Sequence, residues 1–231
     1  AVVGESGAVV GVRLSDTLTG ATHEIRARVV VNASGPWADR LIGLAEGGEP
    51  SIQLVRSKGI HLIVPKLTNS HAIASFSGHG HFFVLPWRDH TILGTTDENF
   101  DGPLDDLHVS ESDVDGLLKV VNAGLPAAKV KRSDVRHAYV GLRPLVDDGS
   151  KDSYGTSRRS EICDHARTDR IEGLVSAIGG KWTTSRHLAA KVVDLIQKKL
   201  HRSHARATTG TTPLTAGRTG NFRAFVVAAE T

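Results

Sequence analysis

The sequence of 231 residues contains no methionine and a single cysteine, Cys163. Because translation starts at methionine and most proteins contain several more, we interpret the sequence as an internal piece of a longer protein. A single cysteine cannot form a disulfide within the chain, which agrees with a reducing compartment. No apolar run approaches the roughly 18 residues that a membrane-spanning helix needs. These absences exclude a disulfide-rich scaffold and a spanning helix for this sequence.

A large excess of charge of one sign is also missing. The chain has 28 Lys and Arg against 25 Asp and Glu, and its densest basic stretch, residues 198–206, contains no aromatic side chain that could stack on a base. We therefore expect no nucleic-acid partner. With 39% hydrophobic and 23% charged residues the composition is that of a globular protein, which excludes a disordered chain.

Apolar patterning predicts a mixed α/β fold of the α+β kind. Alternation predicts half-buried hairpin strands over 2–28, and the β-branched run at 29–31 predicts a strand covered on both faces. Further strands, mostly antiparallel, are predicted at 52–55, 60–65, 81–86, 91–95, 135–145 and 174–178. Helical spacing predicts helices at 37–45, 110–122 with Ser110 as N-cap, 183–200, and the first turns of another at 222–229.

The strongest candidate site is the predicted strand-to-helix junction at 179–184. Gly179 and Gly180 let another molecule approach the backbone closely, and we expect Thr183 and Thr184 to cap the helix with their hydroxyls. Lys181 adds a full positive charge to the partial charge of the helix N-terminus. Such an end suits a phosphate, a carboxylate or a reduced flavin. The alternative is a tight turn with an exposed lysine.

Arg143 is a second candidate, because it interrupts the apolar strand pattern at 139–145. A charge in that position must pair or reach a cavity. A guanidinium matches a phosphate or carboxylate with two parallel hydrogen bonds. The alternative is a structural ion pair with an aspartate such as Asp147 or Asp148, and the spacing leaves both open.

His61 alternates with apolar residues at 58–65, so we expect its side chain on one face of a sheet. It is either a core histidine satisfied by hydrogen bonds or a base with a pKa near about 6.5. The other histidines suggest no metal site. The close pairs His79 with His81 and His201 with His204 have no cysteine or carboxylate nearby to complete a tetrahedral set, and we expect exposed loop histidines there.

Two weaker signals are loops next to predicted strands. The small residues at 32–37 follow the run at 29–31, and open α/β sheets bind ligands at the carboxyl ends of their strands. The segment 94–97 is either a ligand loop or a turn that closes a hairpin. The nucleophile elbow, the Walker loop and the HExxH zinc motif are absent from the sequence, so hydrolase and NTPase interpretations lose their support.

Five segments, in this order and spacing, resemble the aerobic-type FAD-dependent glycerol-3-phosphate dehydrogenases. They are VVNASGPWADRL at 30–41, KGIHLIVPKL at 58–67, FFVLPWRDHTILGTTDENFDG at 82–102, YVGLRPLVDDG at 139–149 and LVSAIGGKWTTSRHLA at 174–189. The resemblance implies a partial FAD/NAD(P)-binding domain of the amino-acid-oxidase-like class with an antiparallel-sheet substrate domain. The family's N-terminal GxGxxG motif is absent here, which agrees with an internal piece.

The resemblance also implies a division into domains. Residues 1–50 would form the rear of the FAD-binding domain with its β-meander, and 51–145 the substrate domain. Residues 146–204 would return to the FAD-binding domain and end with its closing helix. Residues 205–231 would be a linker and the start of a truncated C-terminal helical domain.

Site roles follow from the same resemblance. His61, Lys181 and Arg143 would be catalytic, with Arg143 and Lys181 binding the substrate and His61 acting as a base for its C2 hydroxyl. The bound cofactor would be FAD, bordered by Ala33, Ser34, Gly35, Gly180, Lys181, Trp182, Thr183 and Thr184.

The implied reaction oxidises sn-glycerol 3-phosphate to dihydroxyacetone phosphate, with hydride transfer to FAD and electrons passed on to a membrane quinone. We expect a cytoplasmic protein, with peripheral association with the inner face of the membrane and a homodimer left open. The alternatives are another flavoenzyme of this class, acting on a 2-hydroxy acid or an amine, and a non-catalytic piece that is inactive and cannot hold FAD alone.

Overall fold

The structure of the chain is a computed structural model, and it describes residues 2–77, 80–146, 160–203, 205–215 and 217–229. Contacts divide the chain into a larger unit, Ala1–Gly179, and a smaller unit, Gly180–Thr231. All strands in the described part of the chain belong to the larger unit, and the smaller unit has two α-helices. The assignment of ranges to an FAD-binding and a substrate domain stays a prediction.

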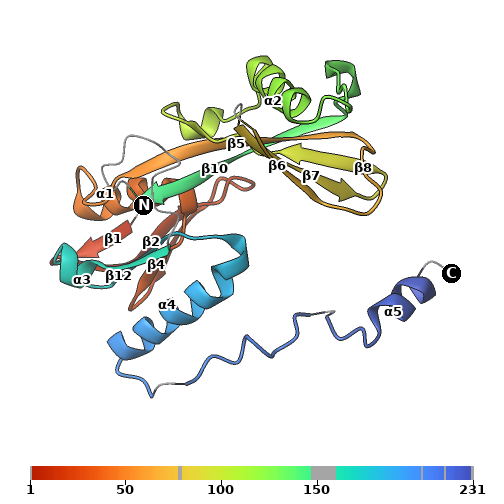
Figure 1. Ribbon diagram of the computed structural model, residues 1–231. Helices are drawn as coiled ribbons and strands as arrows, with labels where there is room; N and C mark the ends of the chain where they lie inside the picture. The colour runs from red at the N-terminus through yellow and green to blue at the C-terminus, as the bar shows by residue number, and fades with distance from the viewer. Residues whose placement is uncertain (1, 78–79, 147–159, 204, 216, 230–231) are drawn as a thin grey trace. The chain divides into compact units, whose positions relative to one another are not determined.

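The largest sheet of the larger unit is built around one long strand (Figure 1). Its strand order is β10-β5-β8-β7-β6, with β9 pairing with β5, and all pairs are antiparallel as the sequence predicts. The strands are β5 (Leu54–Pro65), β6 (Ile73–Ser77), β7 (Gly80–Trp87), β8 (His90–Gly94), β9 (Glu98–Asn99) and β10 (His137–Val146).

β5 replaces the two separate strands that the sequence predicts at 52–55 and 60–65. The polar residues between those ranges fit into one continuous strand because each charge has a partner. Arg56 forms an ion pair with Asp39 at 2.5 Å, and Lys58 forms one with Asp113 at 2.6 Å.

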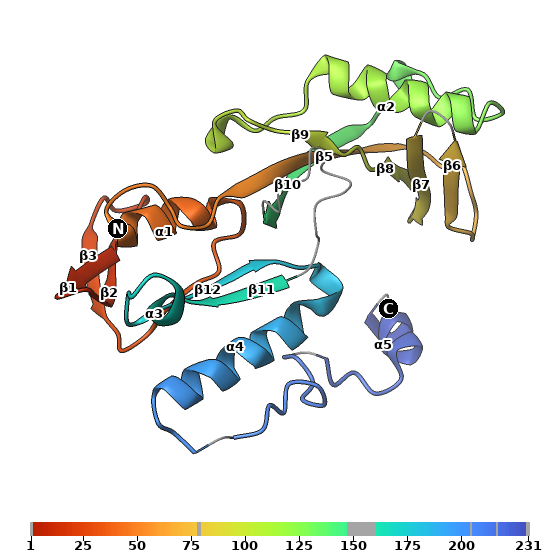
Figure 2. The ribbon, with the colours of Figure 1, turned by 60° about the vertical axis from the view of Figure 1, so that its left-hand side comes forward.

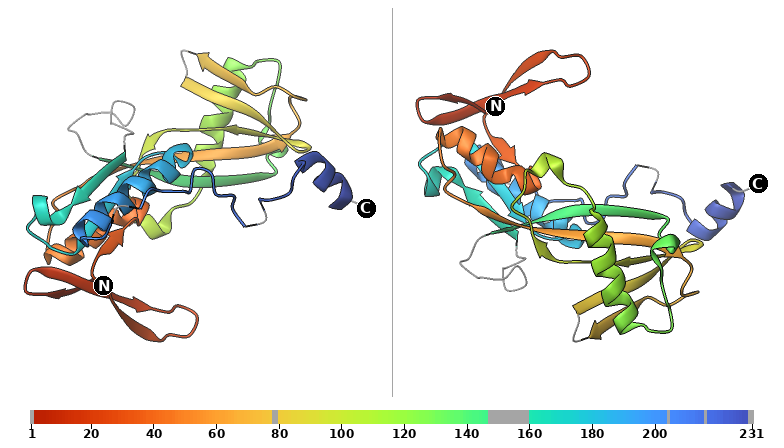
Figure 3. Two further views of the ribbon diagram at one scale, coloured as in Figure 1. Left: turned by 90° about the horizontal axis from the view of Figure 1, so that it is seen from below. Right: turned by 90° about the horizontal axis from the view of Figure 1, so that it is seen from above.

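One face of this sheet is covered by α2 (Glu111–Gly124), as Figures 2 and 3 show. The predicted N-cap Ser110 is confirmed, and it forms a capping box with Asp113. Because side chains alternate along a strand, every second residue of β5 points to the helix and the others point to the opposite face. The buried core between sheet and helix comprises Ile60, Leu62, Val64, Phe82, Val84, Leu93, Val114, Leu117, Leu118, Val121 and Val130.

Two three-stranded sheets complete the larger unit. The first is the predicted antiparallel meander of β1 (Val2–Glu5), β2 (Ala8–Ser15) and β3 (Thr22–Arg26), although β3 is exposed along its whole length rather than half-buried. The second has the order β11-β12-β4, from β11 (Ser160–Asp164), β12 (Leu174–Gly179) and β4 (Val30–Asn32). β4 is parallel to β12 and β11 is antiparallel to it.

The prediction that the run at 29–31 is covered on both faces is wrong. β4 is the edge strand of its sheet, and Val31 is 41% exposed. Its other face packs beneath α1 (Ala38–Glu46), which follows the short 3-10 helix η1 (Gly35–Trp37). β11 and the short helix α3 (His165–Thr168) have no counterpart in the sequence predictions, because their polar residues mask the apolar pattern. Two further 3-10 turns are η2 (Leu104–Asp106) and η3 (Arg132–Asp134).

The smaller unit contains η4 (Trp182–Thr184), α4 (Ser185–Lys199) and α5 (Phe222–Ala229). The hydroxyl caps predicted for α4 are not formed. The side chain of Thr184 bonds to the backbone of Lys181 instead, donating to its carbonyl oxygen at 3.1 Å, because the η4 turn separates the glycines from the helix.

Candidate active site

The sheet face opposite α2 carries His61 and Arg143, the two predicted catalytic residues of the larger unit. Three cross-strand pairs follow one another along β5 and β10 on this face: His61 with Tyr139, Gly59 with Gly141, and Ser57 with Arg143. The middle pair is two glycines, so no side chain rises from the sheet between the histidine and the arginine. Strand pairing brings the two candidates together. The guanidinium of Arg143 lies over Gly59, and the position at Gly141 is open.

Neutral oxygens hold the guanidinium of Arg143 on this face. Its Nη1 donates to Ser57 Oγ at 3.1 Å, and its Nη2 donates to Thr95 Oγ1 at 2.8 Å and to the carbonyl oxygen of Thr96 at 3.2 Å. The side chain remains 28% exposed. These hydrogen bonds fix the direction of the guanidinium, and part of the side chain is open to solvent.

Asp97 is the acidic partner that the structure gives to Arg143. Its Oδ1 lies 3.9 Å from Arg143 Nη1, and its side chain is only 3% exposed. The hydroxyl of Ser57 donates to the same carboxylate oxygen. Asp147 and Asp148, the partners named from the sequence, lie outside the described residues. At 3.9 Å the carboxylate of Asp97 partly offsets the charge of Arg143 but does not form a close bidentate ion pair with the guanidinium.

The loop at 94–97 does not close a hairpin. β8 and β9 both pair with the same edge of β5, with Gly94 opposite His61 and Asn99 opposite Ser57, so the loop bulges between two collinear strands. The loop is fixed to the sheet where Thr96 Oγ1 accepts a hydrogen bond from the Ile60 amide at 3.0 Å. It positions the oxygens that hold Arg143.

Arg143 reaches this loop by crossing β5 at Gly59. β10 and the loop lie on opposite sides of β5, so the side chain must pass over the strand. A Cβ at Gly59 would lie 2.3 Å from Arg143 Nη2 and 2.6 Å from Nη1. A glycine at 59 is therefore what allows the crossing, and sequence reasoning missed this role because the two residues are far apart in the chain.

His61 lies half-buried on the same face, as predicted from its alternation. Its ring stacks on Tyr139, with 4.9 Å between centroids and 9° between planes, and a Cβ at Gly94 would lie 2.5 Å from its Cδ2. Burial, and after it the positive charge of Arg143, lowers the pKa of His61 below its ordinary value. Within the described part of the chain its ring makes no hydrogen bond, so stacking rather than hydrogen bonding fixes it, and the neutral imidazole can accept a proton.

Ala33, Ser34 and Gly35 leave β4 at the edge where β12 also ends. Parallel strands have their carboxyl ends on the same side, and ligands of α/β sheets bind there. Ala33 is exposed, and a Cβ at Gly35 would meet no atom within 4 Å. Gly35 and Gly179 both have positive φ, at 58° and 68°. The edge is thus open and free of bulky side chains, which fits the approach of a large cofactor such as FAD.

Arg56 fixes the turn that leads from this edge into α1. Its Nε and Nη2 donate to the carbonyl oxygen of Pro36 at 3.1 and 2.8 Å, and its Nη2 also pairs with Asp39. The side chains of Arg56 and Asp39 are 16% and 11% exposed. This buried pair ties the turn that follows β4 to β5, the strand that carries His61.

Gly180 and the four residues after it form the N-terminal end of the smaller unit. Gly180 has a positive φ of 88°, as a close backbone approach requires, and Lys181, Trp182, Thr183 and Thr184 are all exposed, Trp182 at 94%. Their predicted roles beside a flavin stay predictions, because these residues belong to a different unit from His61 and Arg143.

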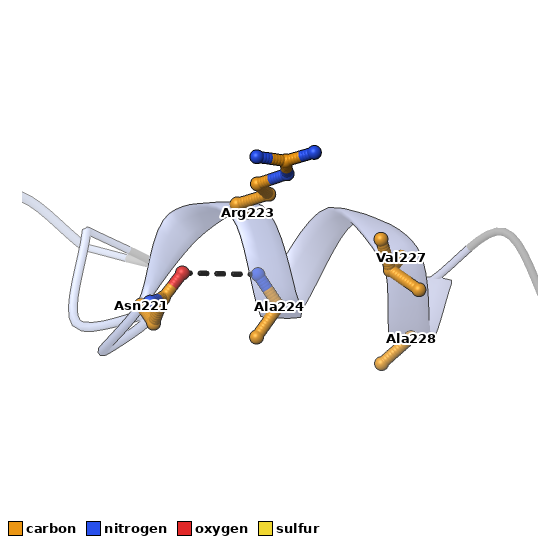
Figure 4. A pocket seen from close by; sticks show the side chains of 5 residues that line it. All are labelled: Asn221, Arg223, Ala224, Val227 and Ala228. Atoms are coloured by element: carbon orange, nitrogen blue, oxygen red, sulfur yellow. Dashed lines mark hydrogen bonds between the residues drawn. The ribbon is translucent and has the colours of Figure 1, made fainter.

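A pocket in the smaller unit carries no argument for a site. Figure 4 shows that its lining comes from α5 and the residue before it: Asn221, Arg223, Ala224, Val227 and Ala228. Asn221 Oδ1 accepts from the Ala224 amide at 3.1 Å, so this side chain caps the N-terminus of α5. The pocket is an open groove along a single helix.

The structure corrects the view of the histidines. His81 is not in a loop but on β7, half-buried beside Phe76 and Phe83, and His79 and His204 lie outside the described residues.

Glu46, His165 and Asp169 come together beneath α1, with ligand atoms within 4.8 Å of one another. Sequence spacing could not reveal this group, since its members are up to 123 residues apart.

Comparison with known proteins identifies the family. The family described as FAD dependent oxidoreductase matches residues 1–195. A glycerol-3-phosphate dehydrogenase of Synechocystis is 34% identical over 224 residues, which cover 91% of this chain and 40% of the relative. A glycerol-3-phosphate dehydrogenase of Mycobacterium leprae is 36% identical over 196 residues, which cover 84% of this chain and 32% of the relative.

A solved structure gives the same answer. The glycerol-3-phosphate dehydrogenase of Bacillus halodurans, complexed with FAD, matches with a TM-score of 0.75 and 30% identity. The match covers 90% of this chain and 39% of that protein. The chain therefore spans less than half the length of the relatives it matches.

Proposed function

The chain belongs to the FAD-dependent oxidoreductase family, and from that premise we propose that the whole protein oxidises sn-glycerol 3-phosphate to dihydroxyacetone phosphate. The relatives named above support this substrate. The observation that carries the proposal is the face of the larger sheet where the fixed guanidinium over Gly59 and the imidazole of His61, with its lowered pKa, lie beside the open position at Gly141. That arrangement suits a small substrate with an anionic end and a hydroxyl.

Arg143 binds the phosphate in this proposal. The guanidinium is held by Ser57 and by the loop at 94–97, so it is oriented before the substrate arrives. Preorganisation of this kind reduces the ordering that binding must otherwise impose. An arginine is suited to a phosphate because its donors form a planar fork.

His61 accepts the proton of the C2 hydroxyl. Because its pKa is lowered, the imidazole is neutral at pH 7 and has a lone pair for that proton. The stack on Tyr139 keeps the ring from rotating away from the sheet face. As the proton leaves the oxygen, C2 becomes a carbonyl carbon and its hydrogen departs as a hydride.

FAD, when bound, supplies the acceptor for that hydride. In this chain the open edge formed by Ala33, Ser34 and Gly35 borders the cofactor. From the smaller unit, as the family resemblance implies, Lys181 would add a positive charge to the flavin site, and Gly180, Trp182, Thr183 and Thr184 would also contact the cofactor. A preorganised positive group is most useful where negative charge develops during the reaction.

We extend the proposal to the fate of the electrons. They pass to a membrane quinone, with the protein associated peripherally with the inner face of the cytoplasmic membrane. In the part of the chain that the structure describes, no helix combines the length and the apolarity needed to cross a bilayer. Sedimentation with lipid vesicles, and reduction of a soluble quinone analogue during turnover, test these two points. A homodimer also stays a prediction, tested by sedimentation velocity.

Turnover with a substrate panel tests the central reaction. The whole protein is assayed with sn-glycerol 3-phosphate, glycerol, glycine and a 2-hydroxy acid, and dihydroxyacetone phosphate is measured as the product. We expect turnover of the phosphate ester alone, since glycerol lacks the group that Arg143 binds. Preferred turnover of glycine or of the 2-hydroxy acid would support the alternative of another flavoenzyme of this class.

A further inference from the structure

A buried row of hydrogen bonds runs beneath α1 from Asp169 to Ser34, which follows the carboxyl end of β4. The carboxylate of Asp169 bonds to Nδ1 of His165, and Nε2 of His165 bonds to Ser176 Oγ at 2.7 Å. Ser176 Oγ accepts from Asn32 Nδ2 at 3.2 Å. Three of these side chains are at most 1% exposed: His165 and Ser176 at 0%, Asn32 at 1%. Polar side chains that are buried this completely need hydrogen-bond partners within the fold, and the row supplies them.

If donation runs from Asn32 toward Asp169, each N–H or O–H group in the row donates to the next side chain. An amide nitrogen can only donate, so Asn32 donates to Ser176. The Ser176 hydroxyl then donates to His165 Nε2, and the other ring nitrogen, as N–H, donates to Asp169. In this direction each of the four side chains has a hydrogen-bond partner in the row. Hydrogen bonds from Thr168, His165 and Ser51 outweigh burial and lower the pKa of Asp169, which keeps it an acceptor.

The row ends at Ser34, one of the residues that border the cofactor in the proposed function. Asn32 Oδ1 accepts from the hydroxyl of Ser34 at 2.6 Å and from its amide at 3.3 Å. Asn32 Nδ2 also donates to the carbonyl oxygen of Ala38 at 2.9 Å, at the first residue of α1. One side chain therefore fixes both the turn that leaves β4 and the start of the helix after it.

A hydrolytic site is excluded by burial. The order Asp169, His165, Ser176 matches the order of acid, base and nucleophile in hydrolase triads. Ser176 is fully buried, however, and its oxygen already accepts from Asn32. No substrate reaches it, so the triad geometry serves another purpose.

A cation site is the second alternative. Glu46 Oε1 is buried next to His165 and Asp169 and has no hydrogen-bond partner among the described residues, while its Oε2 accepts from the Ser51 amide at 2.7 Å. A metal ligand must offer a lone pair, and both ring nitrogens of His165 are already used in the row. A cation would have to break the row to bind.

We propose that Asp169, His165, Ser176 and Asn32 form a positioning relay that holds Ser34 and the β4 edge in the geometry that binds FAD. The inference rests on the proposed function for the identity of the cofactor. None of the four residues touches the cofactor in this proposal; they act through Ser34 and through the start of α1. The relay connects Asp169, which lies beside Glu46 at the C-terminal end of α1, with Ala38 at the start of the same helix, and through Ser34 with cofactor affinity.

The test is FAD affinity in two relay variants and one control of the whole protein. Ser176→Ala deletes the hydroxyl at the centre of the row, and Asn32→Asp keeps the acceptor for Ser34 but removes the donor to Ser176 and Ala38. The control is Cys163→Ala, which also deletes one heavy atom. Cys163 lies opposite Ser176 on the neighbouring strand β11 and packs in the same core, outside the row.

Titration of FAD into the apoprotein, followed by flavin fluorescence, gives the dissociation constant. We expect it to rise about tenfold in both relay variants and to change less than twofold in Cys163→Ala. The apoprotein of Ser176→Ala and of the control should unfold at similar temperatures, which separates positioning from loss of packing. The visible spectrum of the bound flavin should shift in the relay variants only.

Three results would overturn the relay. They are wild-type affinity in both variants, an equal loss of affinity in Cys163→Ala, and an FAD affinity that falls with EDTA and returns with Mg²⁺ or Zn²⁺. The last would make Glu46, His165 and Asp169 a cation site. Failure of the wild-type whole protein to bind FAD would contradict the proposed function itself, and is read directly from the same titration.

Discussion

The imidazole of His61 lies parallel to the ring of Tyr139, at 4.9 Å between centroids, and its pKa is lowered by burial and by the charge of Arg143. A base must be neutral to accept a proton. We predict that kcat/KM is constant near pH 7 and falls only at more acidic pH, as His61 becomes protonated at a pKa below its ordinary value of 6.5. The pH dependence of kcat/KM between about pH 5 and 8 measures this.

Two variants sharpen the pH experiment. His61→Ala should lower the rate and remove the acidic decline, whereas His137→Ala, which changes a more exposed histidine of the same sheet face, should keep it. An unaltered acidic decline in His61→Ala would assign the base to another residue.

Arg143→Ala should raise KM for sn-glycerol 3-phosphate at least tenfold, because a charge-assisted hydrogen bond to a phosphate contributes about 1.5 to 3 kcal/mol. The same change should raise the pKa of His61 toward its ordinary value, since the positive charge beside it is gone. Steady-state kinetics and an NMR titration of His61 measure the two effects. Arg132→Ala, at an arginine paired with Glu111 and Asp115, is the control and should leave KM as it is.

Gly59→Ala should disturb the site more than Gly141→Ala, although the two glycines lie opposite each other. A Cβ at 59 would collide with the guanidinium of Arg143, whereas one at 141 would meet no atom within 4 Å. We expect Gly59→Ala to raise KM severalfold, approaching the effect of Arg143→Ala. Equal KM values in the two glycine variants would mean that Arg143 does not need its path over β5 to bind substrate.

The sequence predicts the strand positions of His61 and Arg143 better than it predicts the partners of Arg143. Strand alternation places His61 and Arg143 on sheet faces, and strand pairing then brings them together. The partners of Arg143 come from the loop at 94–97, and a bulge in a strand edge leaves no periodic signal. The sequence therefore suggests aspartates close in the chain, while the structure supplies Asp97, 46 residues away.

The limits of the fold prediction have similar causes. The single strand β5 was divided in the prediction because Arg56 and Lys58 break its apolar pattern, and only tertiary ion pairs show why they fit. The run at 29–31 predicts a fully covered strand, but the number of neighbours of a strand depends on the rest of the sheet. His165 and Ser176 are ordinary polar residues in sequence, and their burial follows from each other's hydrogen bonds.

The ion pair of Lys58 with Asp113 should stabilise the larger unit. Burial alone would raise the pKa of Asp113, but bonds from Lys58 and Ser110 lower it below its ordinary value of 3.8. Its contribution is therefore complete above that value and is lost as the pH falls through the lowered pKa.

Lys58→Met leaves a buried carboxylate unpaired and should cost about 3 kcal/mol in the free energy of unfolding. Urea titration at pH 7 measures it, with Arg132→Ala as an exposed control that should cost under about 1 kcal/mol. If both variants lose the same small amount, the buried pair contributes no more than a surface pair.

Anaerobic reduction of the bound flavin tests the central claim most directly. The whole protein, loaded with FAD, is mixed with sn-glycerol 3-phosphate in a stopped-flow instrument, and the visible flavin absorbance is followed. The account predicts rapid bleaching that matches the amount of dihydroxyacetone phosphate formed, no bleaching with glycerol, and a much weaker response at equal substrate concentration in Arg143→Ala. Bleaching by glycine or a 2-hydroxy acid, with none by the phosphate ester, would contradict it.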